Sequence, residues 1–283
     1  MSQPTSTTIL RCGKYVSIYI ITTIIFMAMG IADERTSNWE FGLGFGGLST
    51  PHYRGSDQSK TYVAPLPYVK YHGEYLTVDR EGARLNFYEQ AGVTLDVSAG
   101  FNFPVDSVEN IARQGMPGLD PVLELGPRAQ FDLLGTAEDI LRIRIALPVR
   151  LATSASLKGF NDAGWTFTPY IQLRYRTAWE TAISFGPVYA SEKYNDYYYQ
   201  VAPEYIQPGR PAYDARDGFS SFRFTLTTSR RLNQSYWFGA FMRYDNLSGT
   251  VILNSPLVKQ VDSVFWGAGI TYIFNKKGND IKW

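Results

Sequence analysis

The residues of this sequence that could carry out catalysis are few and widely spaced. Histidine occurs only at His52 and His72. The strand pattern described below puts these two at opposite ends of the molecule, so they cannot share a metal ion or act as a pair. His52 with Ser49 or Ser56 is the one combination that would suit a serine hydrolase acting on lipids, but residue types alone do not supply the geometry that such catalysis needs. We therefore expect no catalytic residues and predict that the protein is not an enzyme.

Signatures of cofactor and metal sites are equally weak. Residues 42–47 have the sequence Gly-Leu-Gly-Phe-Gly-Gly, which formally fits the glycine pattern of dinucleotide-binding sites. That pattern needs a following helix and an acidic residue about 20 positions later, whereas a polar loop follows here. The single cysteine, Cys12, lies in a segment that we expect to be removed, which excludes disulfides and thiolate zinc sites in the mature chain. The sequence thus predicts no cofactor and no metal site.

Charged residues are the more informative group, and an alternating pattern positions them. From Leu141 to Leu151 every odd position is apolar, whereas the even positions include Arg142, Arg144 and Arg150. A helix would scatter these arginines around its circumference, but a strand places them all on one face. Pieces of about ten residues with this period are typical of transmembrane β-barrels, which have a lipid-facing outer surface and a polar interior.

The same alternation recurs along the chain and predicts about twelve strands. They are expected at 39–48, 61–71, 75–79, 83–88, 92–103, 120–132, 139–151, 165–177, 179–191, 218–230, 234–246 and 262–274. Long connections, at 49–60, 104–119, 152–164, 192–217 and 247–261, alternate with tight turns. Short periplasmic turns and long outer loops are the usual asymmetry of outer-membrane barrels. We therefore predict an all-β fold, a closed antiparallel transmembrane β-barrel.

The N-terminal residues resemble an export signal. Arg11 and Lys14 precede an apolar run over residues 15–31, and the small residue Ala32 stands just before an acidic segment. An uncleaved anchor is the alternative, although a run of about 17 residues is at the lower limit for a membrane span. The expected organisation is a signal peptide over 1–32, an outer-membrane barrel over 33–274 and a polar C-terminal tail over 275–283.

Composition agrees with a place in the cell outer membrane. The chain has 283 residues, a formal net charge of +1 and 15% aromatic residues. A charge so close to zero gives no attraction for nucleic acid, so we expect no nucleic-acid partner. The aromatic content suits the girdles that such barrels place at the two surfaces of the membrane, in contact with outer-membrane lipid.

Charges of both signs share the inward faces of the expected strands. The lumen-facing residues that we single out are Glu124, Arg128, Arg142, Arg144, Arg150, Arg174, Arg223 and Arg243. One interpretation is a charged pore lining that selects solutes. The other is an interior of paired charges that makes the barrel rigid and leaves little open channel. Acids and arginines in similar numbers favour pairing, because pairing avoids the cost of burying lone charges.

The loop over 192–217 contains six tyrosines. Two interpretations stay open for it: a ligand-binding surface, because tyrosine offers a large amphipathic contact area, or a loop folded down over the barrel. We also expect that residues 197–201 extend a strand above the membrane.

Five short motifs together resemble a known family. They are Pro51–Asp57, Ala64–Tyr68, Leu123–Pro127, Ser184–Pro187 and Ser255–Val258. In their order and spacing they are similar to the MipA/OmpV family, the MltA-interacting outer-membrane proteins, over about residues 39–274.

The resemblance implies an outer-membrane barrel without known catalytic residues. The name-giving member is described as a scaffold that joins a lytic murein transglycosylase to a murein-synthesising penicillin-binding protein. The resemblance therefore implies a scaffold with these two enzymes as partners. A solute-selective outer-membrane channel is the alternative, and an outer-membrane lipid hydrolase is a third hypothesis.

Overall fold

The computed structural model describes residues 39–72, 76–79, 82–156 and 159–274. The expected signal peptide and the expected tail over 275–283 lie outside the described residues. In the described part of the chain, no helix is long and apolar enough to span a membrane.

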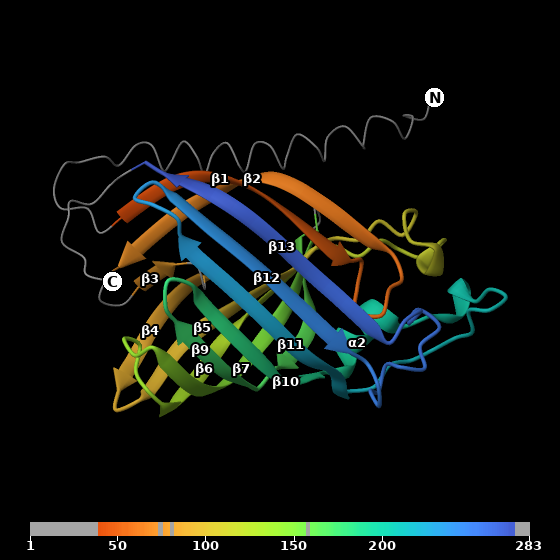
Figure 1. Cartoon of the computed structure of the whole chain (residues 1–283). Helices are drawn as coiled ribbons and strands as arrows, with labels where there is room; N and C mark the ends of the chain where they lie inside the picture. Colours follow the sequence, from red (N-terminus) through yellow and green to blue (C-terminus); the bar gives the residue numbers. More distant parts are fainter. Residues whose placement is uncertain (1–38, 73–75, 80–81, 157–158, 275–283) are drawn as a thin grey trace. The chain divides into compact units, whose positions relative to one another are not determined.

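The described residues form one sheet of thirteen strands (Figure 1). They are β1 (Trp39–Pro51), β2 (Ser59–His72), β3 (Leu76–Asp79), β4 (Gly82–Gln90), β5 (Val93–Asn102), β6 (Val122–Leu134), β7 (Leu141–Ser156), β8 (Gly159–Phe167), β9 (Tyr170–Arg176), β10 (Glu180–Ala190), β11 (Gly218–Arg231), β12 (Tyr236–Asn246) and β13 (Asp262–Ile273). The helical elements are η1 (Ile111–Arg113), α2 (Glu192–Tyr199) and η2 (Pro203–Tyr205).

The sheet closes into a ring. Sequential strands pair around it, β10 pairs with β11, and β13 returns to pair antiparallel with β1. Closure is what lipid requires, because an open edge would leave backbone N–H and C=O groups without partners. The prediction of a closed antiparallel barrel is confirmed.

The difference between thirteen strands and the expected twelve comes from one interruption. β8 and β9 lie end to end between the same two neighbours, because each of them pairs with both β7 and β10. The break falls at Thr168 and Pro169, and a proline has no N–H for the ladder. The ring therefore has twelve strand positions, and one of them is filled by two strands.

Side chains alternate across the barrel wall as the sequence pattern predicts. In β7, Arg142 and Arg144 are buried, whereas Leu147 and Leu151 on the opposite face are exposed. Exposed aromatic residues flank this outer apolar surface at both ends of the strands. Tyr175, Trp179, Tyr236 and Tyr272 lie toward the short turns, and Phe101, Trp165, Tyr189 and Phe222 lie toward the long loops.

The two ends of the barrel differ. Tight turns at one end include Ala91–Gly92, where both residues have a positive φ, as the favoured two-residue hairpin turn requires. The opposite end carries the long loops and α2 (Figure 1). Two expectations are wrong there. The segment 152–164 is not a long loop, because β7 continues to Ser156 and β8 begins at Gly159, and residues 197–199 belong to α2 and not to a strand.

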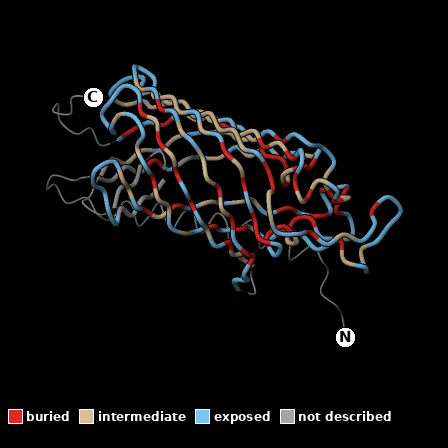
Figure 2. The backbone as a smooth tube through the Cα atoms, turned by 90° about the horizontal axis from the view of Figure 1, so that it is seen from below, coloured by how far each residue is buried: buried red, intermediate tan, exposed pale blue. Residues whose placement is uncertain are grey.

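The loops build a cap with its own apolar core. We use "cap" for residues 52–58, 103–121, 191–217 and 247–261. Twelve buried apolar residues of the cap form its core, among them Tyr53, Leu119, Tyr199, Leu247 and Leu257, and four buried residues of the adjoining strands complete it. Burial in Figure 2 is densest at this end. The barrel interior, in contrast, holds mostly polar side chains.

Candidate functional site: an arginine-lined lumen below the cap

A cavity of about 1040 Å³ occupies the barrel interior. Six of the eight residues singled out in the sequence line it: Arg128, Arg142, Arg144, Arg150, Arg174 and Arg223. Glu124 and Arg243 line a smaller cavity of about 100 Å³ just below the cap. Arg150, Thr168, Val188 and Arg223 line both, so the small cavity is the cap-side extension of the large one.

The arginines of the large cavity contact acids of the same wall. Arg128 donates to both carboxylate oxygens of Asp96, at 2.9 and 2.6 Å. Arg142 forms a two-pronged pair with Asp132, and Arg144 lies 3.6 Å from the same carboxylate. Such two-pronged pairs fix geometry as well as charge. This side of the lumen is therefore rigid.

The facing side of the lumen is lined mainly by small, uncharged residues, although Arg223, Trp237 and Phe241 also belong to it. β11, β12, β13 and β1 contribute Thr225, Thr227, Gly239, Ala240, Gly269 and Gly46 to the lining. Side chains this short leave the large cavity open. The lumen thus has one wall rich in charged residues and one wall of mostly small, uncharged side chains.

Arginines outnumber acids in the described part of the lumen. Nine arginines and five carboxylates line the two cavities, and a sixth carboxylate, Asp132, is bound to Arg142 and Arg144. The sequence led us to expect similar numbers of arginines and acids in the lumen. The described residues instead give the lumen an excess of positive charge.

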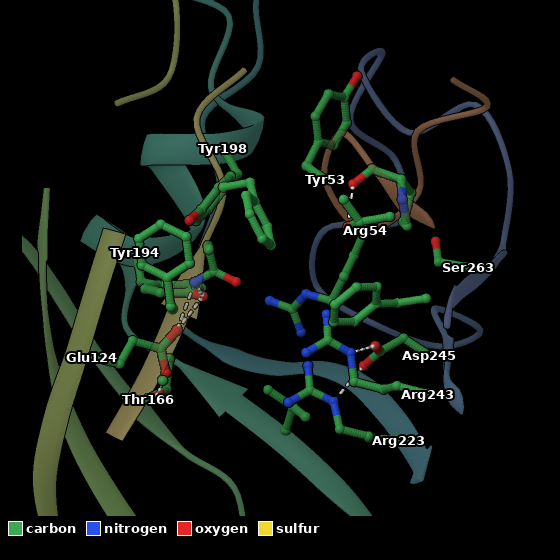
Figure 3. Close-up of a pocket in the computed structure, with 18 of the residues that line it drawn as sticks. Tyr53, Arg54, Glu124, Thr166, Tyr194, Tyr198, Arg223, Arg243, Asp245 and Ser263 are labelled. Carbon is green, nitrogen blue, oxygen red and sulfur yellow. Dashed lines mark hydrogen bonds and ion pairs between the residues drawn. The ribbon is translucent and has the colours of Figure 1, made fainter. Parts of the chain in front are cut away.

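The small cavity alone is lined by four arginines and two carboxylates (Figure 3). Arg223 Nε lies 2.9 Å and Arg243 Nε lies 3.2 Å from the carboxylate of Asp245. Arg54 reaches down from the cap and donates to Ser221 Oγ at 2.9 Å. Three guanidinium groups thus gather beside one carboxylate.

Glu124 stands on the other side of the small cavity and joins the cap to the wall. Its carboxylate accepts hydrogen bonds from Tyr194 Oη at 2.8 Å, Asn102 Nδ2 at 2.9 Å and Thr166 Oγ1 at 3.1 Å. Arg150 Nη1 lies 3.8 Å away. All its partners are fixed by the fold, so this carboxylate is held in one position.

Arg54 and Tyr194 also line the lumen, although the strand pattern does not predict them, because both come from the cap. Ser191 caps the N-terminus of α2, and its hydroxyl accepts a hydrogen bond from Tyr194 N. A serine followed by an acidic residue is a helix-start signal that the sequence does contain. Arg54 precedes Gly55, whose φ of +86° turns the loop back toward the barrel.

His52 does not form a catalytic pair with a serine. Its Nδ1 lies 3.0 Å from Asn110 Nδ2, and the same amide donates to Ser56 Oγ at 3.1 Å. Among the described residues no hydrogen bond joins His52 to Ser49 or Ser56, so the base-to-nucleophile contact of a hydrolase is not made. The described part of the chain also holds no cluster of three or more histidine, cysteine, aspartate or glutamate residues that could bind a metal.

Burial controls the protonation of the cap residues near the lumen. It raises the pKa of Tyr194, Tyr198 and Tyr199, so these hydroxyls stay protonated and can donate hydrogen bonds. Burial, together with the nearby Lys60 ammonium, lowers the pKa of His52.

The capped barrel can be placed among known proteins. The sequence matches the family described as MltA-interacting protein MipA over residues 43–274. The chain belongs to the MipA family. It is accordingly an outer-membrane β-barrel, and the resemblance noted from its motifs is confirmed.

Solved structures with a related fold are distant from this MipA-family chain. The outer membrane channel COG4313 from Pseudomonas putida F1 is 11% identical, with a TM-score of 0.43 and coverage of 87% of this chain and 98% of the channel. The outer membrane protease OmpT from Escherichia coli is 8% identical, with a TM-score of 0.31 and coverage of 83% and 94%. No curated protein matches the sequence.

Proposed function

We propose that this protein is an outer-membrane scaffold that binds a lytic murein transglycosylase at the turn end of the barrel and brings it together with a murein-synthesising penicillin-binding protein. The family description, MltA-interacting protein, supports the first partner. The structural observation that supports a scaffold is the cap, because a barrel end filled by a packed apolar core is poorly suited to steady conduction.

Hydrogen bonds across the cap support this argument. Tyr53 Oη donates to Leu257 O at 2.9 Å, Arg113 Nη1 donates to Tyr198 O at 2.9 Å, and Ser255 Oγ donates to Tyr199 O at 2.8 Å. These three bonds join all four loop segments of the cap. Loops connected in this way form a fixed cover and do not swing freely.

The turn end offers the surface for the partners. Short turns of outer-membrane barrels face the periplasm, where murein and its enzymes lie. Leu134, Ile140, Trp179 and Leu232 are all exposed at these turns. Exposed apolar and aromatic side chains are the usual anchors of protein contacts. We assign this group as the contact surface.

A charge placed in this surface tests the scaffold. Ile140→Glu should abolish retention of a purified MltA-type transglycosylase on the immobilised barrel. The matched control is Ile111→Glu, because Ile111 is also exposed but lies in the cap. The control should retain the enzyme. If both variants bind like the parent chain, the contact surface is wrong. If the unaltered barrel never retains the enzyme, the scaffold itself is wrong.

Deletion of residues 276–283 provides a second test. These residues follow the last strand and are polar except for Ile281 and Trp283. If the truncated barrel assembles but no longer retains the penicillin-binding protein, the tail carries that second contact. Unchanged retention of both enzymes assigns both contacts to the turns.

A solute-selective channel is the second candidate, and the cavity of about 1040 Å³ favours it. Planar-bilayer recording separates the two functions. A scaffold with a fixed cap should show little conductance until the cap is loosened by Tyr199→Ala, which removes a large, fully buried side chain from its core. Steady conductance of the unaltered protein that changes with Arg144→Gln would favour the channel.

A further inference from the structure

The small cavity below the cap carries more positive charge than its acids neutralise. Its charged lining residues are Arg54, Arg150, Arg223, Arg243, Glu124 and Asp245. Arg150 lies near Glu124, which leaves three arginines for the single carboxylate of Asp245. Arginine side chains stay charged in proteins, so a surplus of two positive charges remains at this position.

Hydrogen-bond donors are in surplus as well. Arg223 donates from Nε to Asp245, and among the described residues its two terminal nitrogens donate to no protein acceptor. Arg243 Nε lies near Asp245 but has no hydrogen-bond partner of good geometry. The hydroxyl of Tyr198, which also lines this cavity, is buried and has no partner among the described residues. Unpartnered donors in a buried place are costly unless a ligand or water satisfies them.

The space and the route fit a small anion. A water molecule needs about 10–15 Å³ of such space, so a cavity of about 100 Å³ has room for one tetrahedral oxyanion with a little water. The cap covers the outer side, whereas the shared lining with the large cavity leaves a route through the lumen. A lipid headgroup outside the barrel wall does not have this route, but a soluble anion does.

We propose that the small cavity binds a doubly charged phosphate group, held by Arg54, Arg223 and Arg243. Planar guanidinium groups match phosphate oxygens with paired N–H donors, and two negative charges offset the surplus. Either inorganic phosphate or a small phosphate monoester fits. In a monoester the remainder of the molecule extends into the large cavity. This site is independent of the partner proposed above.

Isothermal titration of the refolded barrel in detergent, at constant ionic strength, tests the site. Inorganic phosphate should bind, and chloride should not compete at equal concentration. Arg243→Gln should weaken phosphate binding by about tenfold or more, the usual effect of removing a charge-assisted contact. Asp245→Asn should strengthen it, because it removes the carboxylate that pairs with Arg223 and Arg243.

Arg128→Gln is the matched control. Arg128 also lines the lumen, but Asp96 neutralises it one to one. Its loss should leave phosphate binding unchanged. If Arg128→Gln weakens phosphate binding as much as Arg243→Gln does, the lumen attracts anions in general and the proposed site is overturned. Weaker phosphate binding in Asp245→Asn would also overturn it.

A second variant and a second ligand complete the test. If Arg243→Gln does not fold, Arg54→Gln replaces it, because Arg54 lies in the cap and not in the barrel wall. Binding of glycerol 3-phosphate as tight as that of inorganic phosphate assigns the monoester class, whereas binding of inorganic phosphate alone restricts the site to the free ion. If neither compound gives a heat of binding, the proposal is overturned.

Discussion

The hydroxyl of Tyr194 in α2 donates a 2.8 Å hydrogen bond to Glu124 Oε1 in β6. This bond joins the cap to the wall of the barrel. Asn102 in β5 and Thr166 in β8 donate to the same carboxylate. The hydrogen bond from Tyr194 therefore fixes the position of α2 relative to β5, β6 and β8.

Removal of this hydroxyl should loosen the cap. We expect Tyr194→Phe to lower cap stability by about 1.5–3 kcal/mol, the range for a hydrogen bond to a charged group. Tyr197→Phe on the same helix is the control, because Tyr197 donates to the uncharged carbonyl of Asp120, and its cost should be about 0.5–1.5 kcal/mol. Amide hydrogen exchange of α2 measures both. Equal protection in the two variants would contradict the proposed link.

The two faces of the barrel wall should respond oppositely to a new arginine. Leu147 lies midway along the membrane part of β7 on the outer face, and Leu147→Arg should cost about 2–4 kcal/mol. Thr227→Arg places the same side chain in the large cavity and should cost little. Urea unfolding in lipid vesicles compares them. A cost at Thr227 as high as at Leu147 would show that the lumen has no room.

Two glycines in the wall should differ sharply in their tolerance of alanine. A Cβ on Gly126 would lie 2.0 Å from Val149 O, a backbone atom that cannot move without shifting β7. We expect Gly126→Ala to cost about 1–3 kcal/mol through overpacking. At Gly47 the nearest atom would be 3.6 Å away, so Gly47→Ala should be neutral. Heat-modifiable migration on gels reports which variant fails to close.

Acid should weaken the cap through His52. Asn110 Nδ2 donates to His52 Nδ1, so this nitrogen must be unprotonated in the native cap. Since the pKa of His52 is lowered in the folded state, the unfolded chain takes up the proton first. The contribution of His52 is therefore complete above about pH 6.5 and is lost as the pH falls through the folded value.

His52→Gln offers an acceptor oxygen that does not titrate. We expect the melting temperature of the parent cap to fall more between about pH 7.5 and 5 than that of this variant. Parallel pH profiles for the two chains would assign the acid sensitivity to other groups.

The barrel could be predicted from the sequence because lipid imposes a strict pattern. Each membrane strand must be apolar outside and polar inside, so the arginines of β7 reveal its faces directly. The pattern ends where the membrane ends. Residues 159–164 include two glycines, an asparagine and an aspartate, yet they form part of β8 above the membrane, where no lipid dictates the alternation.

The phosphate-binding cluster could be predicted only in part. Arg223, Arg243 and Asp245 lie on strands, and their inward direction follows from the alternation. Arg54 comes from a loop whose path depends on contacts such as Lys259 N to Gly55 O at 2.7 Å, more than 200 residues apart in sequence. A local sequence pattern cannot predict a contact between residues so far apart in the chain.

The apolar core of the cap lies outside the lipid-facing wall, so the two parts of the molecule depend on different solvents. The cap is stabilised by removal of apolar surface from water, and its strength follows temperature and urea as in a soluble domain. The ring is stabilised by backbone pairing that lipid enforces. We therefore expect the outer loops to unfold and refold as a cooperative unit of their own while the ring stays closed.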